Sequence, residues 1–151
     1  MSLERLPRQR IDDAVALLKR IEGKFAPAAF ANSLGAEDMV LTDLIARHQL
    51  GIAVATLDTG RLHAQTLALV PRIEERYDLT VEVHRPRTES VVRFVKANGE
   101  NPMRDSIELR KACCDLRKLE PLSRMLAARS AWVTGLRREQ SDARAIVPFS
   151  E

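Results

Sequence analysis

Apolar residues follow two patterns along the chain. Short continuous apolar runs are typical of buried strands, whereas apolar residues that recur every three or four positions are typical of amphipathic helices. The short runs predict strands at residues 28–31, 52–57, 79–83 and 131–134. The helical spacing predicts helices at residues 11–25, 37–47, 62–77, 88–97 and 107–128. Strands that alternate with helices predict an α/β, doubly wound fold in which helices cover both faces of a parallel sheet.

Two prolines lie inside predicted helices. Because proline lacks an N–H group and clashes with the preceding turn, we expect Pro71 to kink or break the helix at 62–77. For the same reason, residues 107–128 are expected to form one or two helices broken at Pro121. No internal repeat, low-complexity tract or linker separates these elements, so residues 1–151 are predicted to form a single domain.

The composition is that of a folded, soluble protein, with 45% hydrophobic and 30% charged residues. The net charge of +3 is mildly basic, and the 4% of aromatic residues leave few side chains to stack on nucleic-acid bases. This balance favours a small phosphorylated anion over a nucleic acid as partner. Residues 1–10 lack the apolar core of a signal peptide, and no apolar stretch is long enough to span a membrane. We therefore expect a cytoplasmic protein with reduced thiols and no membrane partner.

In a parallel sheet, ligands bind at the carboxyl ends of the strands, so the loops that follow the predicted strands are candidate sites. The first, Ser33-Leu34-Gly35-Ala36-Glu37-Asp38, leads into a helix, where backbone N–H groups and the positive helix end attract a phosphate. The alternative is an ordinary strand-to-helix turn, in which Ser33 or Asn32 caps the helix and Gly35 relaxes the backbone. The residues alone leave both interpretations open.

Two further loops follow predicted strands. In Leu57-Asp58-Thr59-Gly60-Arg61, Asp58 can accept hydrogen bonds from a ribose or a ring amino group; the alternative is an ordinary turn, because Asp and Gly are common turn residues. The run that begins Thr134-Gly135-Leu136-Arg137-Arg138 carries arginines, whose planar guanidinium groups match phosphate and sulfate oxygens. Its alternative is a solvated basic loop.

The two cysteines of the chain are adjacent, at Cys113-Cys114. Neighbouring cysteines rarely form a disulfide because the ring is strained, and the basic residues around this pair favour the thiolate, which binds metals or attacks sulfur. Two thiolates are half of the four ligands that zinc and iron–sulfur centres usually need. The alternative is a pair of small, inert core residues. His48, His63 and His84 are too dispersed to predict a shared metal site.

Taken together and in this order, the three loops and the cysteine segment, which continues into Arg117-Lys118-Leu119-Glu120-Pro121-Leu122, resemble the assimilatory adenylyl-sulfate reductases. These enzymes belong with the phosphoadenylyl-sulfate reductases in the adenine nucleotide alpha hydrolase-like, or PP-loop, group. The resemblance covers the chain from about Phe25 onward and implies the PP-loop fold, incomplete at the C-terminal end. The cysteine pair discriminates most, because reductases specific for the 3'-phosphorylated substrate typically lack it.

The resemblance implies reduction of adenosine 5'-phosphosulfate to sulfite and AMP in sulfate assimilation, with electrons from thioredoxin. It places around the nucleotide Ser33, Gly35, Ala36, Glu37, Asp38, Asp58, Thr59 and Gly60, and it makes Gly135 a further substrate-binding residue. It places Lys118, Arg137 and Arg138 near the phosphosulfate, where cations must neutralise the oxygens before an anionic thiolate can attack the sulfur. It makes Cys113 and Cys114 two of the four ligands of a 4Fe-4S cluster with a structural and electrostatic role.

The family takes its other cluster ligands from a downstream Cys-x-x-Cys pair and its nucleophile from a Cys-Gly-Leu-His motif, and these 151 residues contain neither. We therefore expect this chain to bind nucleotide weakly, to hold no normal cluster and to show no reductase turnover. An unpaired sheet edge would favour a homo-oligomer.

Three alternatives stay open. They are a phosphoadenylyl-sulfate reductase, a non-catalytic adenine-nucleotide-binding module, and an ATP-using PP-loop enzyme that adenylylates its substrate. The last class normally has a Ser-Gly-Gly-x-Asp-Ser loop, which is matched here by Ser-Leu-Gly-Ala-Glu-Asp and so lacks a glycine and the final serine.

Overall fold

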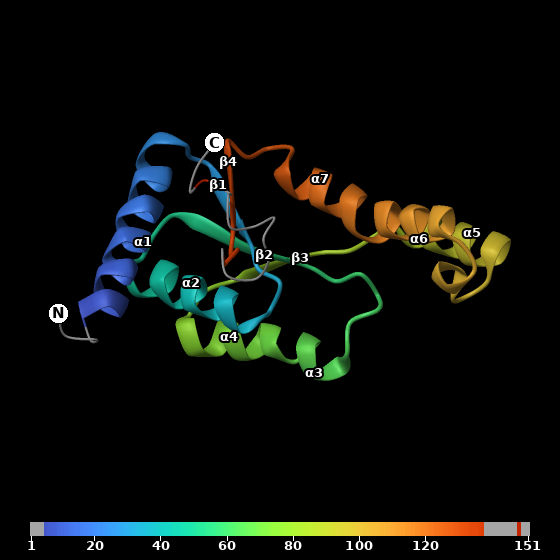
Figure 1. The fold of residues 1–151 in the computed structure, drawn as a ribbon, viewed down its shortest axis with the longest axis horizontal. Coiled ribbons are helices and arrows are strands. Elements are labelled where there is room, and N and C mark those ends of the chain that lie inside the picture. The colour runs from blue at the N-terminus through green and yellow to red at the C-terminus, as the bar shows by residue number, and fades with distance from the viewer. Residues whose placement is uncertain (1–4, 138–147, 149–151) are drawn as a thin grey trace.

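The computed structural model describes residues 5–137 and residue 148. In this part of the chain, helices and strands alternate and form a parallel sheet (Figure 1). The sheet has 4 strands in the order β3-β2-β1-β4, and every neighbouring pair is parallel. The strands are β1 (Ala28–Ala31), β2 (Ile52–Leu57), β3 (Val81–His84) and β4 (Ala131–Thr134). The predicted α/β class with a parallel sheet is confirmed.

Helices precede, connect and flank these strands. They are α1 (Arg5–Lys24), α2 (Ala36–Arg47), α3 (Ala64–Leu67), α4 (Leu69–Tyr77), α5 (Thr88–Asn98), α6 (Ile107–Cys114) and α7 (Glu120–Leu126). A short 3-10 helix, Pro102–Arg104, precedes α6, and a π-helical segment, Asp115–Leu119, joins α6 to α7. α2 and α4 lie side by side, and α7 contacts β2 and β3 (Figure 1). The chain therefore follows the strand and helix order that the apolar pattern predicts.

The interruptions of the helices differ from the prediction. The predicted helix at 62–77 breaks at Ala68, and Pro71 lies in the first turn of α4, where N–H groups have no intrahelical partner. The predicted break at Pro121 was wrong, because residues 107–126 stay helical. Pro121 lies in the first turn of α7, directly after the π-helical segment. Hydrogen bonds in a π turn join residues that are five apart instead of four, and this change of spacing allows the helix to continue past a proline that has no N–H group to donate.

The core lies between the sheet and its nearest helices. β1 is at its centre because it has strands on both sides, and Phe30 in β1 is 0% exposed. Leu18 from α1, Leu44 from α2 and Ile73 from α4 are buried in the same cluster. This packing fixes the positions of β1 and β2, and therefore of the points at which the loops after them begin.

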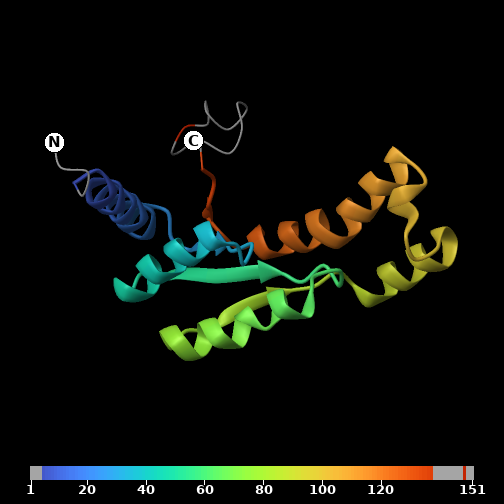
Figure 2. The same ribbon diagram turned by 60° about the horizontal axis from the view of Figure 1, so that its bottom comes forward.

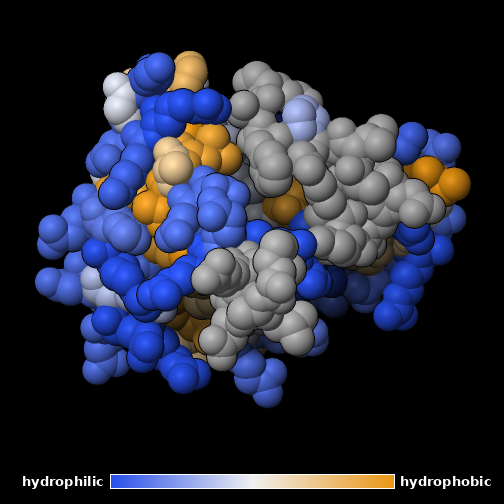
Figure 3. All heavy atoms as spheres, turned by 60° about the vertical axis from the view of Figure 1, so that its left-hand side comes forward, coloured by the Kyte–Doolittle hydropathy of each residue, from blue (hydrophilic) through white to orange (hydrophobic). Residues whose placement is uncertain are grey.

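α5 and α6 extend beyond the sheet (Figure 2). No residue of α5 is buried, so this helix adds little to the core. Figure 3 views the molecule from the side of α1, where hydrophilic side chains predominate and apolar ones show between them. Within the described ranges, none of the helices combines the length and the apolar character needed to cross a membrane.

Candidate functional site

The predicted loops after β1, β2 and β4 emerge at one edge of the sheet. Ala31, at the end of β1, pairs with Ala55 of β2 on one side and with Thr134 of β4 on the other. The chain moves outward from β1 to β2 and β3, and then returns to place β4 on the opposite side of β1. The direction of winding therefore reverses between β1 and β4. In open α/β sheets, ligands bind at such a switch point, outside the carboxyl ends of the strands.

The loop after β1 is anchored by its own buried polar side chains. Asp38 is 3% exposed, and its Oδ2 accepts hydrogen bonds from the backbone N–H and the hydroxyl of Ser33, each at 2.6 Å. Asn32 donates from Nδ2 to Thr42 Oγ1 at 2.8 Å, and its Oδ1 accepts from the N–H of Leu34 at 2.7 Å. Asp38 therefore shapes the loop from the inside, whereas Ser33 lies on its exposed side.

Among the residues that the structure describes, no side-chain hydrogen bond caps the start of α2. Gly35 is the N-cap residue, in an extended conformation, and Ala36 begins the helix. The interpretation in which Ser33 or Asn32 caps this helix is therefore wrong, because Ser33 Oγ accepts from the N–H of Gly35 and Asn32 Oδ1 from that of Leu34, both before the first helical residue. Uncapped N–H groups at the positive end of a helix are the donors that bind phosphate in many α/β proteins.

The loop after β4 lies against the start of α2. A Cβ atom on Gly135 would overlap Asp38 Oδ1, so a side chain at this position would collide with the helix. Arg137 reaches the same helix, and its Nη2 lies 2.7 Å from Glu37 Oε1. Asp38 Oδ1 is buried and has no hydrogen-bond partner among the residues that the structure describes. Predicted site residues from the first and last loops are thus in contact, whereas Arg138 lies outside the described residues.

The loop after β2 is held by a side chain from the next strand connection. Asp58 is 9% exposed, and its Oδ1 accepts from the N–H of Gly60 at 3.0 Å. Asp58 Oδ2 accepts from Arg85 Nε, also at 3.0 Å. Gly60 has a φ of 73°, in the left-handed region that favours glycine. Both carboxylate oxygens of Asp58 therefore hold the loop.

The cysteine pair lies at the end of α6. Cys113 is buried and Cys114 is exposed. Arg117, in the π-helical segment, is 7% exposed, and its Nη1 donates to the carbonyl oxygen of Thr59 at 2.8 Å. Lys118 follows it and is exposed. The bond to Thr59 joins the cysteine segment to the loop after β2.

The two thiols fit a metal centre in part. In the ranges 5–137 and 148, no group of three or more His, Cys, Asp and Glu side chains is placed to hold a metal ion. A four-ligand zinc or iron–sulfur centre therefore needs two donors beyond Cys113 and Cys114.

Sequence reasoning missed two arginines at this edge. Arg85 follows β3 directly, and applying the loop rule to the third strand would have found it. Arg117 stands within the cysteine segment, but its neighbours give no signal that it is buried while Lys118 is exposed. That difference arises because the π-helical segment packs against α5 and places Arg117 on the loop after β2.

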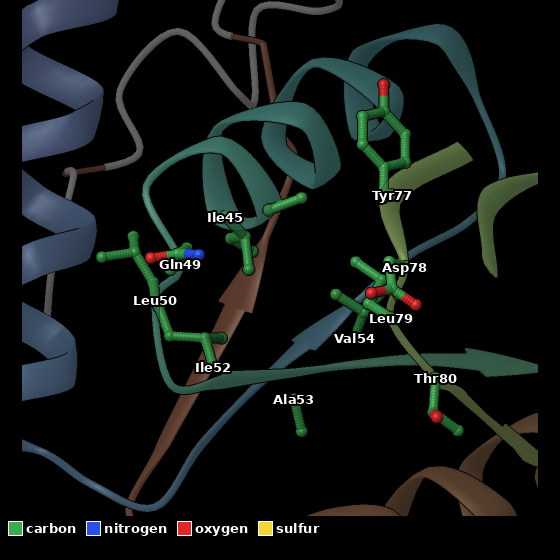
Figure 4. Close-up of a pocket in the computed structure, with 11 residues that line it drawn as sticks. Ile45, Gln49, Leu50, Ile52, Ala53, Val54, Tyr77, Asp78, Leu79 and Thr80 are labelled. Carbon is green, nitrogen blue, oxygen red and sulfur yellow. The ribbon is translucent and has the colours of Figure 1, made fainter. Parts of the chain in front are cut away.

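A cavity of about 420 Å³ opens at the opposite edge of the sheet (Figure 4). It lies between the ends of α2 and α4 and the starts of β2 and β3, with Gln49, Leu50, Asp78 and Thr80 among its lining residues. None of the predicted site residues that the structure describes lines this cavity, and the charged residue in the lining is the acidic Asp78. The described residues that line it therefore include no cationic side chain to attract a phosphate.

The fold and the contacts at its carboxyl edge define a parallel α/β domain with an uncapped strand-loop-helix at its switch point. Comparison with known proteins narrows this class. The phosphoadenosine phosphosulfate reductase domain family matches residues 27–151. The chain belongs to this family, as its resemblance to adenylyl-sulfate reductases predicts.

Similar curated proteins are adenosine 5'-phosphosulfate reductases. The chain is 49% identical over 135 residues to the one from Neisseria meningitidis serogroup A, which covers 89% of this chain and 55% of that protein. It is 45% identical over 151 residues to the one from Allochromatium vinosum, which covers 100% of this chain and 59% of that protein. The chain thus spans slightly more than half the length of these relatives.

A solved structure shares the fold. The phosphoadenylyl-sulfate (PAPS) reductase from Candida auris, in a phosphate complex, matches with a TM-score of 0.71 over 95% of this chain and 71% of that chain. The two sequences are 22% identical, so this likeness shows the fold alone.

Proposed function

We propose that this chain forms the nucleotide-binding part of an adenylyl-sulfate reductase, an oxidoreductase that reduces adenosine 5'-phosphosulfate to sulfite and releases AMP. One observation carries the proposal: Gly135 after β4 lies against Asp38 of α2, so two loops expected to bind the substrate meet at the switch point. Identities of 49% and 45% to relatives of that name support the same substrate.

The start of α2 supports phosphate binding. Among the residues that the structure describes, its first N–H groups have no side-chain cap, and Ser33 lies exposed on the same loop. The hydroxyl of Ser33 donates to Asp38 Oδ2, so it must turn away from Asp38 to donate to a phosphate. We assign the phosphate of the nucleotide to Ser33, Gly35 and Ala36, and we assign to Asp38 the task of shaping the loop beneath it. The adjacent loop at residues 58–60 then faces the adenosine.

Cationic side chains support binding of the phosphosulfate. We assign to Lys118, Arg137 and Arg138 the role of neutralising its oxygens, and Arg137 already lies beside the start of α2. Arg137 pairs with Glu37, but the two side chains are 60% and 30% exposed. Exposed ion pairs contribute about 1 kcal/mol or less, so a phosphosulfate with two negative charges can replace Glu37 as the partner of Arg137.

In the whole reaction, a cysteine thiolate attacks the sulfur, the bond from sulfur to the phosphate oxygen breaks, and AMP leaves. The dithiol of thioredoxin then reduces the S-sulfocysteine and releases sulfite. We propose that Cys113 and Cys114 are instead two ligands of a 4Fe-4S cluster, which would supply structural and electrostatic support. Because the chain has 2 cysteines, this assignment leaves none for the attack. We place the reaction in the cytoplasm, where thiols stay reduced.

Isothermal titration of the 151-residue chain with AMP and with adenosine 5'-phosphosulfate tests the proposed site. We expect Lys118→Ala to weaken phosphosulfate binding about tenfold, as loss of one charge-assisted hydrogen bond predicts, and AMP binding by about twofold or less. Lys111→Ala removes another exposed lysine, from α6, and should change neither affinity. Failure of the unmodified chain to bind AMP at millimolar concentration would contradict the proposal.

Anaerobic reconstitution with iron and sulfide tests the assignment of the cysteines. We expect the chain to bind iron below the amount of a full cluster, or at one cluster for two chains, and to form no sulfite with thioredoxin. Cys113→Ser should remove the bound iron. A full, stable cluster in a monomer would show that other residues supply the missing ligands.

A further inference from the structure

Arg117 is a buried charged residue, and the contacts that it makes do not explain why an arginine occupies this position. It is 7% exposed, and its Nη1 donates to the carbonyl oxygen of Thr59, 58 residues away in the sequence. Its Nε is buried without a hydrogen-bond partner in the described part of the chain. A buried donor without a partner destabilises a protein, so a smaller apolar residue would suit a purely structural position better.

The cysteine pair and Arg117 belong to one continuous helical segment. Cys113 and Arg117 are four residues apart, so they share one side of the helix, and both are buried. Cys114 and Lys118 have the same spacing, and both are exposed. Because the π-helical segment follows α6 without a break, any displacement of the cysteines also moves Arg117. π-Helical turns are rare and often occur at functional sites.

The other end of this contact is a loop with little freedom. Thr59 is buried, Asp58 is held by Arg85, and Gly60 has a φ of 73°. A Cβ atom on Gly60 would lie 3.1 Å from Arg117 Nη1, so the guanidinium packs closely against the loop. The position of Arg117 therefore limits where the backbone of residues 58–60 can lie.

We propose that Arg117 is a positioning residue that couples the cysteine pair to nucleotide binding by the loop after β2. The inference rests on the proposed function, because it takes residues 58–60 as part of the nucleotide site. When the thiols are bound and the segment is held in place, Arg117 keeps the loop in its binding conformation. Coupling between two binding events is reciprocal, so the nucleotide must also change the affinity of the thiols for a metal ion by the same factor.

Titration of the 151-residue chain with AMP, with and without saturating Cd²⁺ as a thiolate probe, tests this coupling. We expect Cd²⁺ to change the Kd for AMP by about fivefold or more, and AMP to change the Kd for Cd²⁺ by the same factor. Arg117→Met should abolish the coupling. Arg117→Lys keeps one donor for the carbonyl of Thr59 and should retain part of it. Arg110→Met, which changes an exposed arginine of α6, should retain all of it.

The outcomes separate the two proposals. If the unmodified chain binds AMP but Cd²⁺ leaves its Kd unchanged, or if the coupling persists in Arg117→Met, the inference is wrong and the proposed function stands. If the unmodified chain does not bind AMP, both are wrong. Should Arg117→Met fail to fold, Gly60→Ala disturbs the same contact from the loop and should lower the coupling. A purely structural Arg117 would lower thermal stability in its variants and leave the coupling intact.

Discussion

The loops after β1 and β2 lie beside each other at the carboxyl edge, but they are held in opposite ways. In the loop after β1, the anchoring bonds are local: Asp38 accepts from Ser33, 5 residues away, and Asn32 donates to Thr42, 10 residues away. These residues belong to one strand-loop-helix unit, so their bonds can form as soon as that unit does. We therefore expect this loop to behave as a rigid platform.

In the loop after β2, the local bond from Gly60 to Asp58 is joined by anchoring bonds from distant segments. Asp58 accepts from Arg85, 27 residues away, and Thr59 accepts from Arg117, 58 residues away. These bonds exist only when β3 and the π-helical segment are in place. The difference teaches that two neighbouring loops at the carboxyl ends of a sheet can differ in what fixes them. The loop after β1 is fixed by residues close to it in the sequence, and the loop after β2 also needs contacts with distant segments.

The largest effect is expected when Asp38, which anchors the loop after β1, is replaced. Asp38→Ala leaves the backbone N–H and the hydroxyl of Ser33 without their acceptor, and we expect the free energy of unfolding to fall by about 3 kcal/mol. Asp43→Ala is the matched control on the same helix: Asp43 pairs with the exposed Arg47, so its loss should cost about 0.5 kcal/mol or less. Urea unfolding measures both, and equal effects would show that the loop does not depend on Asp38.

The second effect tests the contact between the loops after β1 and β4. Gly135→Ala places a Cβ atom against Asp38 Oδ1, and we expect it to lower the free energy of unfolding by about 2 kcal/mol through overpacking. Gly23→Ala is the control, because its Cβ would meet nothing within 4 Å in helix α1; it should raise stability by about 0.5 kcal/mol. A neutral Gly135→Ala would mean that the two loops separate in solution.

The third effect tests the non-local anchor. Arg85 is 65% exposed, so Arg85→Met should lower the free energy of unfolding by about 1 kcal/mol or less. Because the variant frees Asp58 and loosens the loop, we expect AMP affinity to fall about fivefold, measured by titration calorimetry. Arg72→Met, at an exposed position of α4, should change neither quantity. Unchanged AMP affinity in Arg85→Met would place the loop after β2 outside the nucleotide site.

The smallest effect is expected at the ion pair between Glu82 and Arg129, which lies outside both loops. Burial raises the pKa of Glu82, but the hydrogen bonds and charges of Arg129 and His84 outweigh it, so the pKa lies below its ordinary 4.5. A lowered pKa stabilises the fold above the unfolded value and loses this contribution as the pH falls through the folded value. Glu82→Gln should therefore cost about 0.5 kcal/mol at pH 7 and nothing at about pH 2.5, measured by unfolding at both pH values. A cost that does not depend on pH would assign the effect to packing.

The apolar pattern predicts most elements because burial leaves a local signal. β1, β2 and β4 have the predicted bounds, since each is a short apolar run between polar turns. β3 begins at Val81 instead of 79, because Val81 is the first residue of this strand that pairs with β2. The error at Pro121 has a different cause: the π-helical segment before it changes the spacing of the backbone hydrogen bonds, and no local pattern predicts that segment.

Side-chain partners were harder to predict. Ser33 is a residue type that often caps helices, yet here its hydroxyl donates to Asp38 Oδ2 and accepts from the N–H of Gly35, which lies before the first helical residue. Arg85 and Arg117 look like surface residues in the sequence. Which acid or carbonyl each of them meets depends on the sheet order, and no local pattern carries that information.

The sequence by itself determined the order of strands and helices, the family, and the segments that stand at the carboxyl ends of the strands, because hydrophobic periodicity and motifs are properties of neighbouring residues. The tertiary structure decided that Gly135 meets Asp38 and that Arg117 meets Thr59. These contacts follow from the order β3-β2-β1-β4, which brings distant loops to one edge. Residues so far apart in the chain can meet only after the whole sheet has formed, so no local pattern in the sequence predicts these contacts.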